Sequence, residues 1–427
     1  MRVAVVVSLG AVLLLLGCSS GTKPLEKVVF VGIDAADWAI ARPLVEQGKM
    51  PNLARLVAEG ATGDLATLQP LQKSPIIWTS IATGVYPDKH GIGGFVTRVA
   101  GGDIVPYTGN VRRVRAIWDI LGERGFKVGV VGWLVTWPAE PVNGYLVSDY
   151  IQYENEHGIK PDRQTYPESL FGEIDGLRLT QKDVSDEAIA AILPAAGSAV
   201  SGGSAVSGSS GTSGATPEPW QKDYVKMCYA TDETFSRAAM YLNKKGVRFL
   251  AVYFNGIDSM CHTFWGSRGQ EGSPVADVIE NYYVWLDQVL GEFMKLADDR
   301  TLFVVCSDHG FHGPRYAADG SLQLGVSMHG DNGIIGLMGP GVRKGVRVPD
   351  ADVLDVTPTI LYALGLPIAR DMDGSVLADA FTSRFLKANP VTTIATFETS
   401  PRKAGEPIPS PVDQEVKKKL KALGYIQ

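Results

Sequence analysis

The sequence predicts an α/β fold: a mostly parallel central sheet with helices on both faces. Short apolar stretches alternate along the chain with longer segments in which apolar residues recur at helical spacing. The connections between them are short, and strands that alternate with helices in this way are typical of a parallel sheet covered on both sides. A third observation is that several of the apolar stretches end abruptly at an acidic residue or a histidine.

The composition is that of a globular protein with a large core. The 427 residues are 45% hydrophobic, so the chain is long enough for one large α/β domain or two smaller ones. The formal net charge of −6 argues against nucleic acid as the main partner, because binding to a phosphate backbone requires a basic surface. A local basic pocket could still bind a phosphate group.

The N-terminus has the features of a targeting segment rather than of the fold. Arg2 supplies a positive charge, residues 3–16 are apolar but too few for an ordinary membrane span, and the LLGC stretch ending at Cys18 resembles a bacterial lipobox. We expect residues 1–17 to be a lipoprotein signal peptide, Cys18 to carry the lipid, and residues 18–26 to be a tether. The protein would then be anchored in the cell envelope, facing the periplasm or the outer membrane. A plain signal peptide or an uncleaved anchor is the alternative.

Ser74 is predicted to lie at the start of a helix. Pro75 fits the first turn of a helix, and the free backbone N–H groups and macrodipole at that end favour an anion. The alternative role for Ser74 is that of a simple N-cap. The other elements expected in this half of the chain are a strand at 28–33, a helix at 50–59 closed by Gly60, a strand at 64–68, a helix at 114–123, a strand at 126–132, and a loop plus a strand within 133–149.

The second half of the chain begins with an insertion. Residues 152–219 break the alternating pattern and contain a Gly/Ser-rich run at 197–214 that should be flexible. Regular structure then returns, with a lysine-rich helix near the C-terminus that we expect to be a solvated surface element. The expected elements are helices at 220–244, 275–296, 353–364 and 412–423, and strands at 247–254, 302–306 and 333–338. We therefore predict a catalytic domain at 27–395 and a tail with a short helix at 396–427.

Three of the predicted strands, at 28–33, 247–254 and 302–306, are followed by side chains that can bind a metal ion. The carboxyl ends of parallel strands meet at one edge of a sheet, where ligands bind in such folds. A histidine in a glycine-rich turn adds a fourth such place. Together these places supply three carboxylates and three imidazoles, which is what two adjacent divalent-metal sites require. The six residues are Asp34, Asp258, His262, Asp308, His309 and His329.

The type and spacing of these residues indicate which kind of metal ion they would bind. Asp258 and His262 are four residues apart, so a helical turn would place both on one face. Mixed Asp/His ligation without a cysteine pattern favours Zn²⁺ or Mn²⁺ over a structural zinc site of the cysteine type. The other three histidines, His90, His157 and His312, lack such a setting. We expect them to be structural or surface groups, with His312 nearest the rim of the site.

At this point the order of the motifs becomes specific. The motifs GIDAADW, MPNLARLVAEG, KSP followed by SIATGVYPDKHGI, NGIDSMCH, SDHGFH and MHGDNG occur in the order found in the alkaline phosphatase superfamily. The chain most resembles the type I phosphodiesterase/nucleotide pyrophosphatase branch of that superfamily. The resemblance covers roughly residues 28–377 and is interrupted by the insertion. It implies an alkaline-phosphatase-like fold.

The resemblance also implies roles for individual residues. One zinc ion would be held by Asp258, His262 and His329, and the other by Asp34, Asp308, His309 and the oxygen of Ser74. Ser74 would be the nucleophile that forms a phosphoseryl intermediate, and Lys73 could contact the phosphate. The implied cofactors are two divalent metal ions, Zn²⁺ or else Mn²⁺. The implied activity is hydrolysis of phosphodiester or pyrophosphate bonds in a phosphorylated small molecule, a nucleotide or a lipid head group.

The sequence departs from this family at two places. The family places an asparagine that donates to the phosphoryl oxygen where this chain has Gly94 and Phe95, so that donor is missing or comes from elsewhere. The nucleophile is serine rather than threonine. The sulfatase signature is also absent, because Pro75 follows Ser74 directly. Two alternatives stay open: a phosphomonoesterase or a phospho- or sulfo-transferase on the same scaffold, and a catalytically inactive lipoprotein that binds at the surface.

Overall fold

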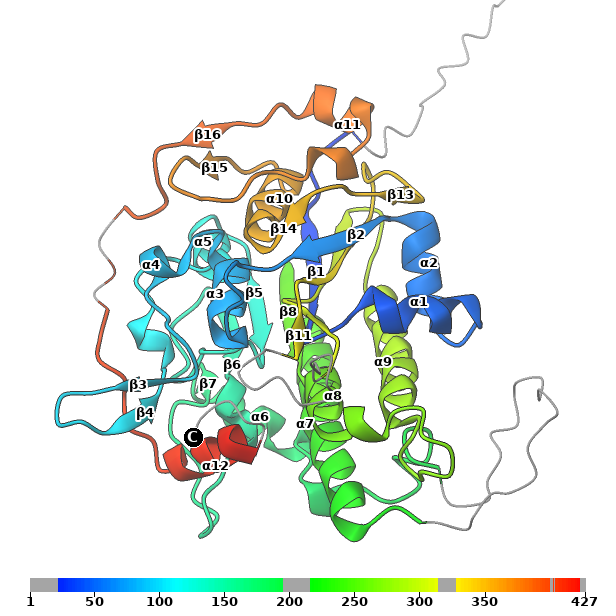
Figure 1. Ribbon diagram of the computed structural model, residues 1–427. Helices are drawn as coiled ribbons and strands as arrows, with labels where there is room; N and C mark the ends of the chain where they lie inside the picture. Colours follow the sequence, from blue (N-terminus) through cyan, green and yellow to red (C-terminus); the bar gives the residue numbers. More distant parts are fainter. Residues whose placement is uncertain (1–21, 195–215, 314–327, 400–401, 403, 423–427) are drawn as a thin grey trace, which may run out of the picture.

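The computed structural model describes residues 22–194, 216–313, 328–399, 402 and 404–422. Within them a central sheet runs through the molecule with helices on both faces, which confirms the predicted fold class (Figure 1). The five strands from β9 to β6 are parallel, whereas β12 and β7 run antiparallel to their neighbours. In sheet order the strands are β13 (Val346–Arg347), β2 (Ala61–Ala66), β12 (Asn332–Met338), β9 (Thr301–Cys306), β1 (Lys27–Ile33), β8 (Phe249–Phe254), β5 (Val128–Val131), β6 (Gly144–Val147) and β7 (Thr165–Tyr166), and β14 (Ala351–Asp352) pairs with β2.

The middle strands are buried on both faces. In β1 the side chains of Val29 and Val31 belong to one hydrophobic core, and those of Val28 and Phe30 belong to the other, as the alternation of a strand requires. The first core is covered by α1 (Trp38–Glu46), α2 (Pro51–Glu59), α7 (Pro219–Lys244), α8 (Gly256–Phe264) and α9 (Val278–Met294). The second is covered by α3 (Ser74–Thr83), α5 (Ile117–Glu123) and α10 (Val356–Ala363).

Most of the expected elements are present with small shifts. Helix α1 was not predicted, because Pro43 lies inside it and a proline usually ends a helical pattern. Asp37 caps this helix by accepting a hydrogen bond from Ala39 N. The expected glycine-rich turn at His329 is a two-residue strand. The remaining short elements are α4 (Pro87–His90), β3 (Val96–Arg98), β4 (Ile104–Pro106), α6 (Leu170–Ile174), β10 (Gly310–Phe311), β11 (His329–Gly330), β15 (Ile368–Ala369), α11 (Ser383–Ala388), β16 (Thr393–Ile394) and α12 (Asp413–Ala422).

The described part of the predicted insertion packs onto the main core. Residues 165–166 form the edge strand β7, and Leu170, Ile174 and Ile192 are buried in the first core. The Gly/Ser-rich run at 197–214 lies outside the described residues. The predicted signal peptide and the lipid site at Cys18 also lie outside them, and lipid attachment stays a prediction that cell fractionation would test. No helix in the described ranges is long and apolar enough to cross a bilayer.

The prediction of a solvated C-terminal helix is wrong. Val412, Val416 and Leu420, on or next to α12, are buried, and they pack in one cluster with Trp137 and Tyr150. The lysines between them suggested a polar surface, but these three apolar residues recur every four positions and form a stripe that contacts the domain. The helix is therefore part of the packed structure.

Candidate active site

The carboxyl ends of three adjacent strands bring the predicted ligands together. β1 lies between β8 and β9 and runs parallel to both. Asp34 follows β1, and Asp308 and His309 follow β9, so these side chains meet at the same edge of the sheet. Helix α8 begins directly after β8, and its first two turns carry Asp258 and His262.

The first cluster consists of Asp34, Asp308, His309 and Ser74, which are all buried. His309 Nε2 lies 3.4 Å from Asp34 Oδ1 and 3.3 Å from Asp308 Oδ2. Ser74 Oγ lies 3.3 Å from the same nitrogen. One ligand atom from each of the two carboxylates and the imidazole lies within 4.8 Å of the other two, a spacing at which one metal ion could contact all three.

Each carboxylate of this cluster has one oxygen held by the protein and the other turned toward the cluster. Asp34 Oδ2 accepts hydrogen bonds from the indole N–H of Trp78 at 3.2 Å and from the hydroxyl of Tyr253 at 2.5 Å. Asp308 Oδ1 accepts one from Ala35 N at 3.4 Å. Asp34 Oδ1 and Asp308 Oδ2 have no hydrogen-bond partner among the described residues. Buried anionic oxygens of this kind are costly unless a cation binds them.

His309 is oriented by its second ring nitrogen. Nδ1 lies 3.0 Å from the carbonyl oxygen of Gly310. A carbonyl oxygen can only accept a hydrogen bond, so Nδ1 is assigned the proton, and Nε2 presents its lone pair to the carboxylates. A metal-binding histidine is typically held in this way, with its other nitrogen donating to a carbonyl or a carboxylate.

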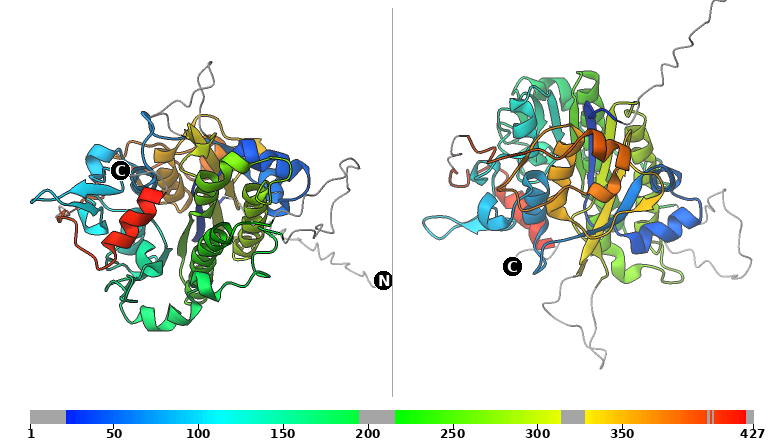
Figure 2. Two further views of the ribbon diagram at one scale, coloured as in Figure 1. Left: turned by 60° about the horizontal axis from the view of Figure 1, so that its bottom comes forward. Right: turned by 90° about the horizontal axis from the view of Figure 1, so that it is seen from above.

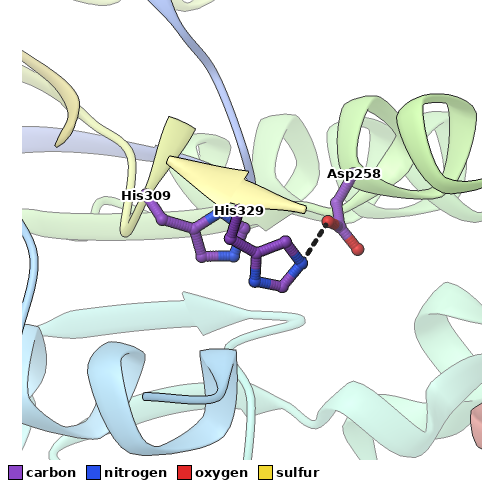
Figure 3. Close-up of side chains that lie close together, drawn as sticks. All are labelled: Asp258, His309 and His329. Carbon is purple, nitrogen blue, oxygen red and sulfur yellow. Dashed lines mark ion pairs between the residues drawn. The ribbon is translucent and has the colours of Figure 1, made fainter. Parts of the chain in front are cut away.

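The second cluster consists of Asp258, His262 and His329. His262 Nε2 lies 2.9 Å from His329 Nε2 and 3.3 Å from Asp258 Oδ1, and His329 Nε2 lies 3.6 Å from that oxygen. The rings of His309 and His329 stack with 3.8 Å between centroids, so the two clusters adjoin. Figure 3 shows both rings beside Asp258, with the ion pair between Asp258 and His329 dashed. The structure thus brings all six predicted ligands into one site.

The electrostatics of the site favour a bound cation. Burial and the charge of Asp258 raise the pKa of Asp34 to about 6, and burial with both neighbouring carboxylates raises the pKa of Asp308 well above its usual range. Burial also opposes ionisation of Asp258, but the imidazoles of the clusters outweigh it and hold its pKa below the usual range. Burial and the adjacent His309 lower the pKa of His329 to about 2, so that ring is neutral. Three carboxylates that oppose one another's ionisation would be stabilised by positive charge between them.

Ser74 is the first residue of α3, as the sequence predicted. Lys73 is the N-cap residue and Pro75 follows in the first turn, so Ser74 lies at the positive end of the helix dipole. Lys73 itself is exposed, and its side chain lies beside Gly94. A Cβ atom added to that glycine would be 3.7 Å from Lys73 Cδ. The predicted contact of Lys73 with phosphate stays a prediction.

The other histidines have the structural or surface settings that were predicted. His90 is buried, with Nε2 at 3.1 Å from Ser80 Oγ and Nδ1 accepting a hydrogen bond from Ile92 N. Burial lowers its pKa to about 3, so it is neutral. His157 is exposed, and His312 is half-buried and near enough to the site to lower the pKa of His329.

A cavity of about 520 Å³ opens beside Ser74, Asp34 and Asp258. The cavity lies between the loops after β5 and β6, helix α7 and helix α12. Much of its wall is aromatic. The aromatic residues that line it include Phe95, Tyr107, Tyr150, Tyr153, Tyr224 and Tyr253.

A family model described as "Type I phosphodiesterase / nucleotide pyrophosphatase" matches residues 28–319, which is more than half of the chain. The chain belongs to this family. The resemblance inferred from the motifs is thereby confirmed, and the protein is a member of a family of hydrolases that act on phosphoester bonds. No curated protein sequence matches the chain.

Solved structures are also similar to this family member, and its fold is that of an alkaline phosphatase. A quadruple mutant of the alkaline phosphatase PafA is 16% identical, covers 84% of this chain and 100% of its own, and has a TM-score of 0.53. Human ectonucleotide pyrophosphatase/phosphodiesterase 5 is 13% identical over 84% of this chain and 100% of its own, with a TM-score of 0.49. A phosphonoacetate hydrolase from Sinorhizobium meliloti 1021 is 20% identical over 70% of this chain, with a TM-score of 0.43, and the match spans 60% of that hydrolase.

Sequence reasoning missed the side chains that hold the ligands in place. Trp78 and Tyr253 lie in a helix and a strand that otherwise read as apolar core, yet both donate a hydrogen bond to Asp34. The indole N–H of Trp78 and the hydroxyl of Tyr253 could have indicated this role, because a buried tryptophan or tyrosine usually finds a hydrogen-bond partner. No local signal placed Lys419 in the cavity wall, since its helix lies far along the chain.

Proposed function

We propose that this protein hydrolyses phosphodiester or pyrophosphate bonds by attack of Ser74 Oγ at a site that binds two divalent metal ions. The observation that carries the proposal is the convergence of Ser74 Oγ, Asp34 Oδ1 and Asp308 Oδ2 on His309 Nε2, all at 3.3–3.4 Å. The second cluster adjoins it through the stacked rings of His309 and His329.

The residues present fit two metal ions. Asp34, Asp308, His309 and Ser74 would hold one, and Asp258, His262 and His329 would hold the other. The donor set is oxygen and imidazole nitrogen, which suits Zn²⁺ and also Mn²⁺. The two buried carboxylate oxygens without a hydrogen-bond partner among the described residues would gain one in the ion.

The chain supplies the remaining steps. A pair of divalent ions, when bound, lowers the pKa of a coordinated hydroxyl and neutralises charge on the attacking and leaving oxygens. Ser74 Oγ then attacks the phosphorus atom in line, the ester bond to the leaving group breaks, and the phosphoryl group is carried by Ser74. Hydrolysis of that phosphoserine regenerates the hydroxyl. The positive end of the α3 dipole would stabilise the phosphoryl oxygens, in the place of the asparagine that the chain lacks at Gly94 and Phe95.

The cavity supports a diester or anhydride over a monoester. Its volume of about 520 Å³ and its aromatic wall offer room and contact area for a second substituent on phosphorus. A phosphomonoester would leave most of that wall without a contact. A substituent with an apolar or planar part is therefore expected.

The test of the proposal is metal content by mass spectrometry, combined with turnover of bis-4-nitrophenyl phosphate and 4-nitrophenyl phosphate before and after chelation. We expect about two metal ions per chain and chelator-sensitive turnover that is faster with the diester. Faster turnover of the monoester would favour the phosphomonoesterase alternative. Absence of bound metal after purification with Zn²⁺ and Mn²⁺ would refute the site assignment and favour the inactive binding protein.

Asp232 is expected to position the second cluster. It is fully buried on α7 and accepts hydrogen bonds from Asn255 N and Gly256 N, at the start of α8, and from the hydroxyl of Tyr282. An Asp232→Asn substitution leaves one acceptor oxygen for three donors and should lower the free energy of unfolding by about 1–3 kcal/mol. Because α8 carries Asp258, the substitution should also weaken binding of the second metal ion, measured by titration with Zn²⁺.

Asp287 offers a matched control for this effect. It accepts hydrogen bonds from Asn52 N, Asn52 Nδ2 and Leu53 N at the start of α2, so it also serves three donors at a helix N-terminus. Asp287→Asn should lose similar stability in urea unfolding but leave Zn²⁺ affinity unchanged. If both variants lose metal affinity equally, the effect is general destabilisation and Asp232 has no positioning role.

A further inference from the structure

The C-terminal helix α12 forms one wall of the active-site cavity. Its residues Val416, Lys418 and Lys419 line the cavity, together with Ser74, Asp258 and other residues that precede it by more than 150 positions. Figure 2 shows α12, in red, beside the β3–β4 hairpin, and Lys417 Nζ donates a hydrogen bond to Ile104 O of that hairpin at 3.3 Å. The helix therefore lies where a substrate that reaches Ser74 would meet it.

The segment before α12 is attached firmly to the domain. Arg402 forms ion pairs with Asp119 and Glu140, which also pair with the buried Arg112. Farther along, Gly405 N donates to Asn110 O at 2.9 Å. These contacts, and the buried apolar stripe of α12, fix the position of the helix. The side chains of α12 that line the cavity therefore belong to a helix that is packed against the domain.

Lys419 is a cation at the cavity wall. Lys418 lies 3.7 Å from Glu415, whereas no carboxylate lies within ion-pair distance of Lys419 in the described ranges. Lys419 Nζ lies 5.9 Å from the centre of the Tyr153 ring, which also lines the cavity. The pKa of Lys419 is raised by its surroundings, first by Tyr153 and then by Cys228, Asp232 and Asp258. Its ammonium group is therefore charged at neutral pH.

Tyr150 contributes its aromatic ring to the same wall. The Tyr150 side chain is 5% exposed, and its hydroxyl has no hydrogen-bond partner among the described residues. Its ring stacks on Trp137 at 4.9 Å and contacts Tyr153, so it is held in place. The hydroxyl is itself buried, so Tyr150 offers its ring, rather than a hydrogen-bond donor, to a ligand in the cavity.

The acidic groups near Lys419 already have other partners. Asp232 accepts three hydrogen bonds, and Asp149 accepts hydrogen bonds from Val135 N and Trp137 N. Asp258 contacts the imidazoles of the second cluster. The charge of Lys419 is therefore available to a ligand in the cavity.

We propose that Lys419 is an anion-binding subsite of the cavity, which selects substrates whose second substituent carries a carboxylate or a phosphate group. This inference rests on the proposed function, because it assumes that the substituent belongs to an ester cleaved at Ser74. The ammonium group of Lys419 pairs with the anion. The aromatic wall contacts the part of the substituent between the phosphorus atom and the anion.

The test uses three 4-nitrophenyl phosphodiesters with the same leaving group. Their second substituents are 2-carboxyethyl, 2-phosphonoethyl and the neutral, isosteric 2-carbamoylethyl. We expect the wild-type protein to favour the carboxyethyl over the carbamoylethyl ester by about tenfold in kcat/KM, which is the effect of one good charge interaction. A larger preference for the phosphonoethyl ester would identify phosphate as the natural group, and a smaller one would identify carboxylate.

The variants separate this subsite from general attraction to the metal ions. Lys419→Met should abolish the preference by lowering kcat/KM for the charged esters about tenfold. Lys421→Met is the matched control, because Lys421 is exposed on the same helix and does not line the cavity. Equal kcat/KM for the charged and neutral esters in the wild-type protein would overturn the inference. So would a preference that survives in Lys419→Met.

A binding measurement keeps this test independent of the proposed activity. In the full-length Ser74→Ala variant, calorimetric titration should give a dissociation constant about tenfold lower for the carboxyethyl than for the carbamoylethyl ester. If the wild-type protein turns over none of the esters, the proposed function fails, but the titration still decides on the subsite. Equal affinities for the two esters would then overturn it as well.

Discussion

Replacing Ser74 with alanine is expected to lower kcat on bis-4-nitrophenyl phosphate by at least about a thousandfold. Ser74 Oγ is the hydroxyl at 3.3 Å from His309 Nε2, and it lies at the start of α3, where the phosphoryl group would be stabilised. The variant loses the atom that would carry the phosphoryl group, whereas all three carboxylates and all three imidazoles of the site remain. Metal content should therefore stay near two ions per chain, measured by mass spectrometry on the same samples.

Two further variants make the result specific to this hydroxyl. Ser74→Thr retains a hydroxyl and should keep measurable turnover. Ser80→Ala removes a buried hydroxyl from the same helix, one that contacts His90 rather than the predicted ligands, and should keep near-wild-type turnover. Wild-type activity in Ser74→Ala would exclude it as the nucleophile. Loss of activity together with loss of metal would instead make Ser74 a ligand whose nucleophilic role is unproven.

The ligand set could be predicted because its signal is local. Asp34 and the pair Asp308-His309 each follow an apolar strand directly, so the rule that parallel strands end at one edge of a sheet brings them together. Asp258 and His262 are four residues apart on a helix, which fixes their relation without knowledge of the fold. The order of the strands in the sheet was not predicted, yet it decides which ends are neighbours.

The cavity wall could not be predicted, because it depends on contacts between distant segments. The stripe formed by Val412, Val416 and Leu420 is visible in the sequence, but the lysines around it made the helix resemble a solvated one. Only its packing on Trp137 and Tyr150 shows that the stripe is a contact face. The subsite proposed for substrate selection lies in this wall, so the family can be read from the sequence more readily than the substrate.

The second large effect is expected from Asp308→Asn, which keeps the volume of the side chain but removes its charge. Asp308 is fully buried, and its Oδ2 lies 3.3 Å from His309 Nε2. An amide oxygen binds Zn²⁺ more weakly than a carboxylate, so the ion held with Asp34 should be lost and metal content should fall from about two to about one per chain. Turnover should fall with it, because Ser74 would no longer share a metal ion with that cluster.

The same substitution should have opposite effects on stability with and without metal. After chelation, Asp308 of the wild-type protein stays buried beside the carboxylates of Asp34 and Asp258, and burial and these two charges raise its pKa. Removing the Asp308 carboxylate should raise the melting temperature of the metal-free protein by about 2 °C or more. With saturating Zn²⁺ the order should reverse, because only the wild-type protein gains the binding free energy of both ions, about 2.7 kcal/mol per ion at a hundredfold excess over Kd.

The exposed Asp331 provides the control, since it lies two residues after His329 but outside both clusters. Asp331→Asn should leave the melting temperature, metal content and turnover close to those of the wild-type protein under both conditions. We expect Asp308→Asn, but not Asp331→Asn, to be more stable than the wild-type protein without metal and less stable with it. This result requires that the buried charge of Asp308 repels its neighbours in the metal-free protein and binds the ion in the metal-loaded one. If Asp308→Asn is less stable than the wild-type protein under both conditions, the carboxylate serves the fold rather than a metal ion.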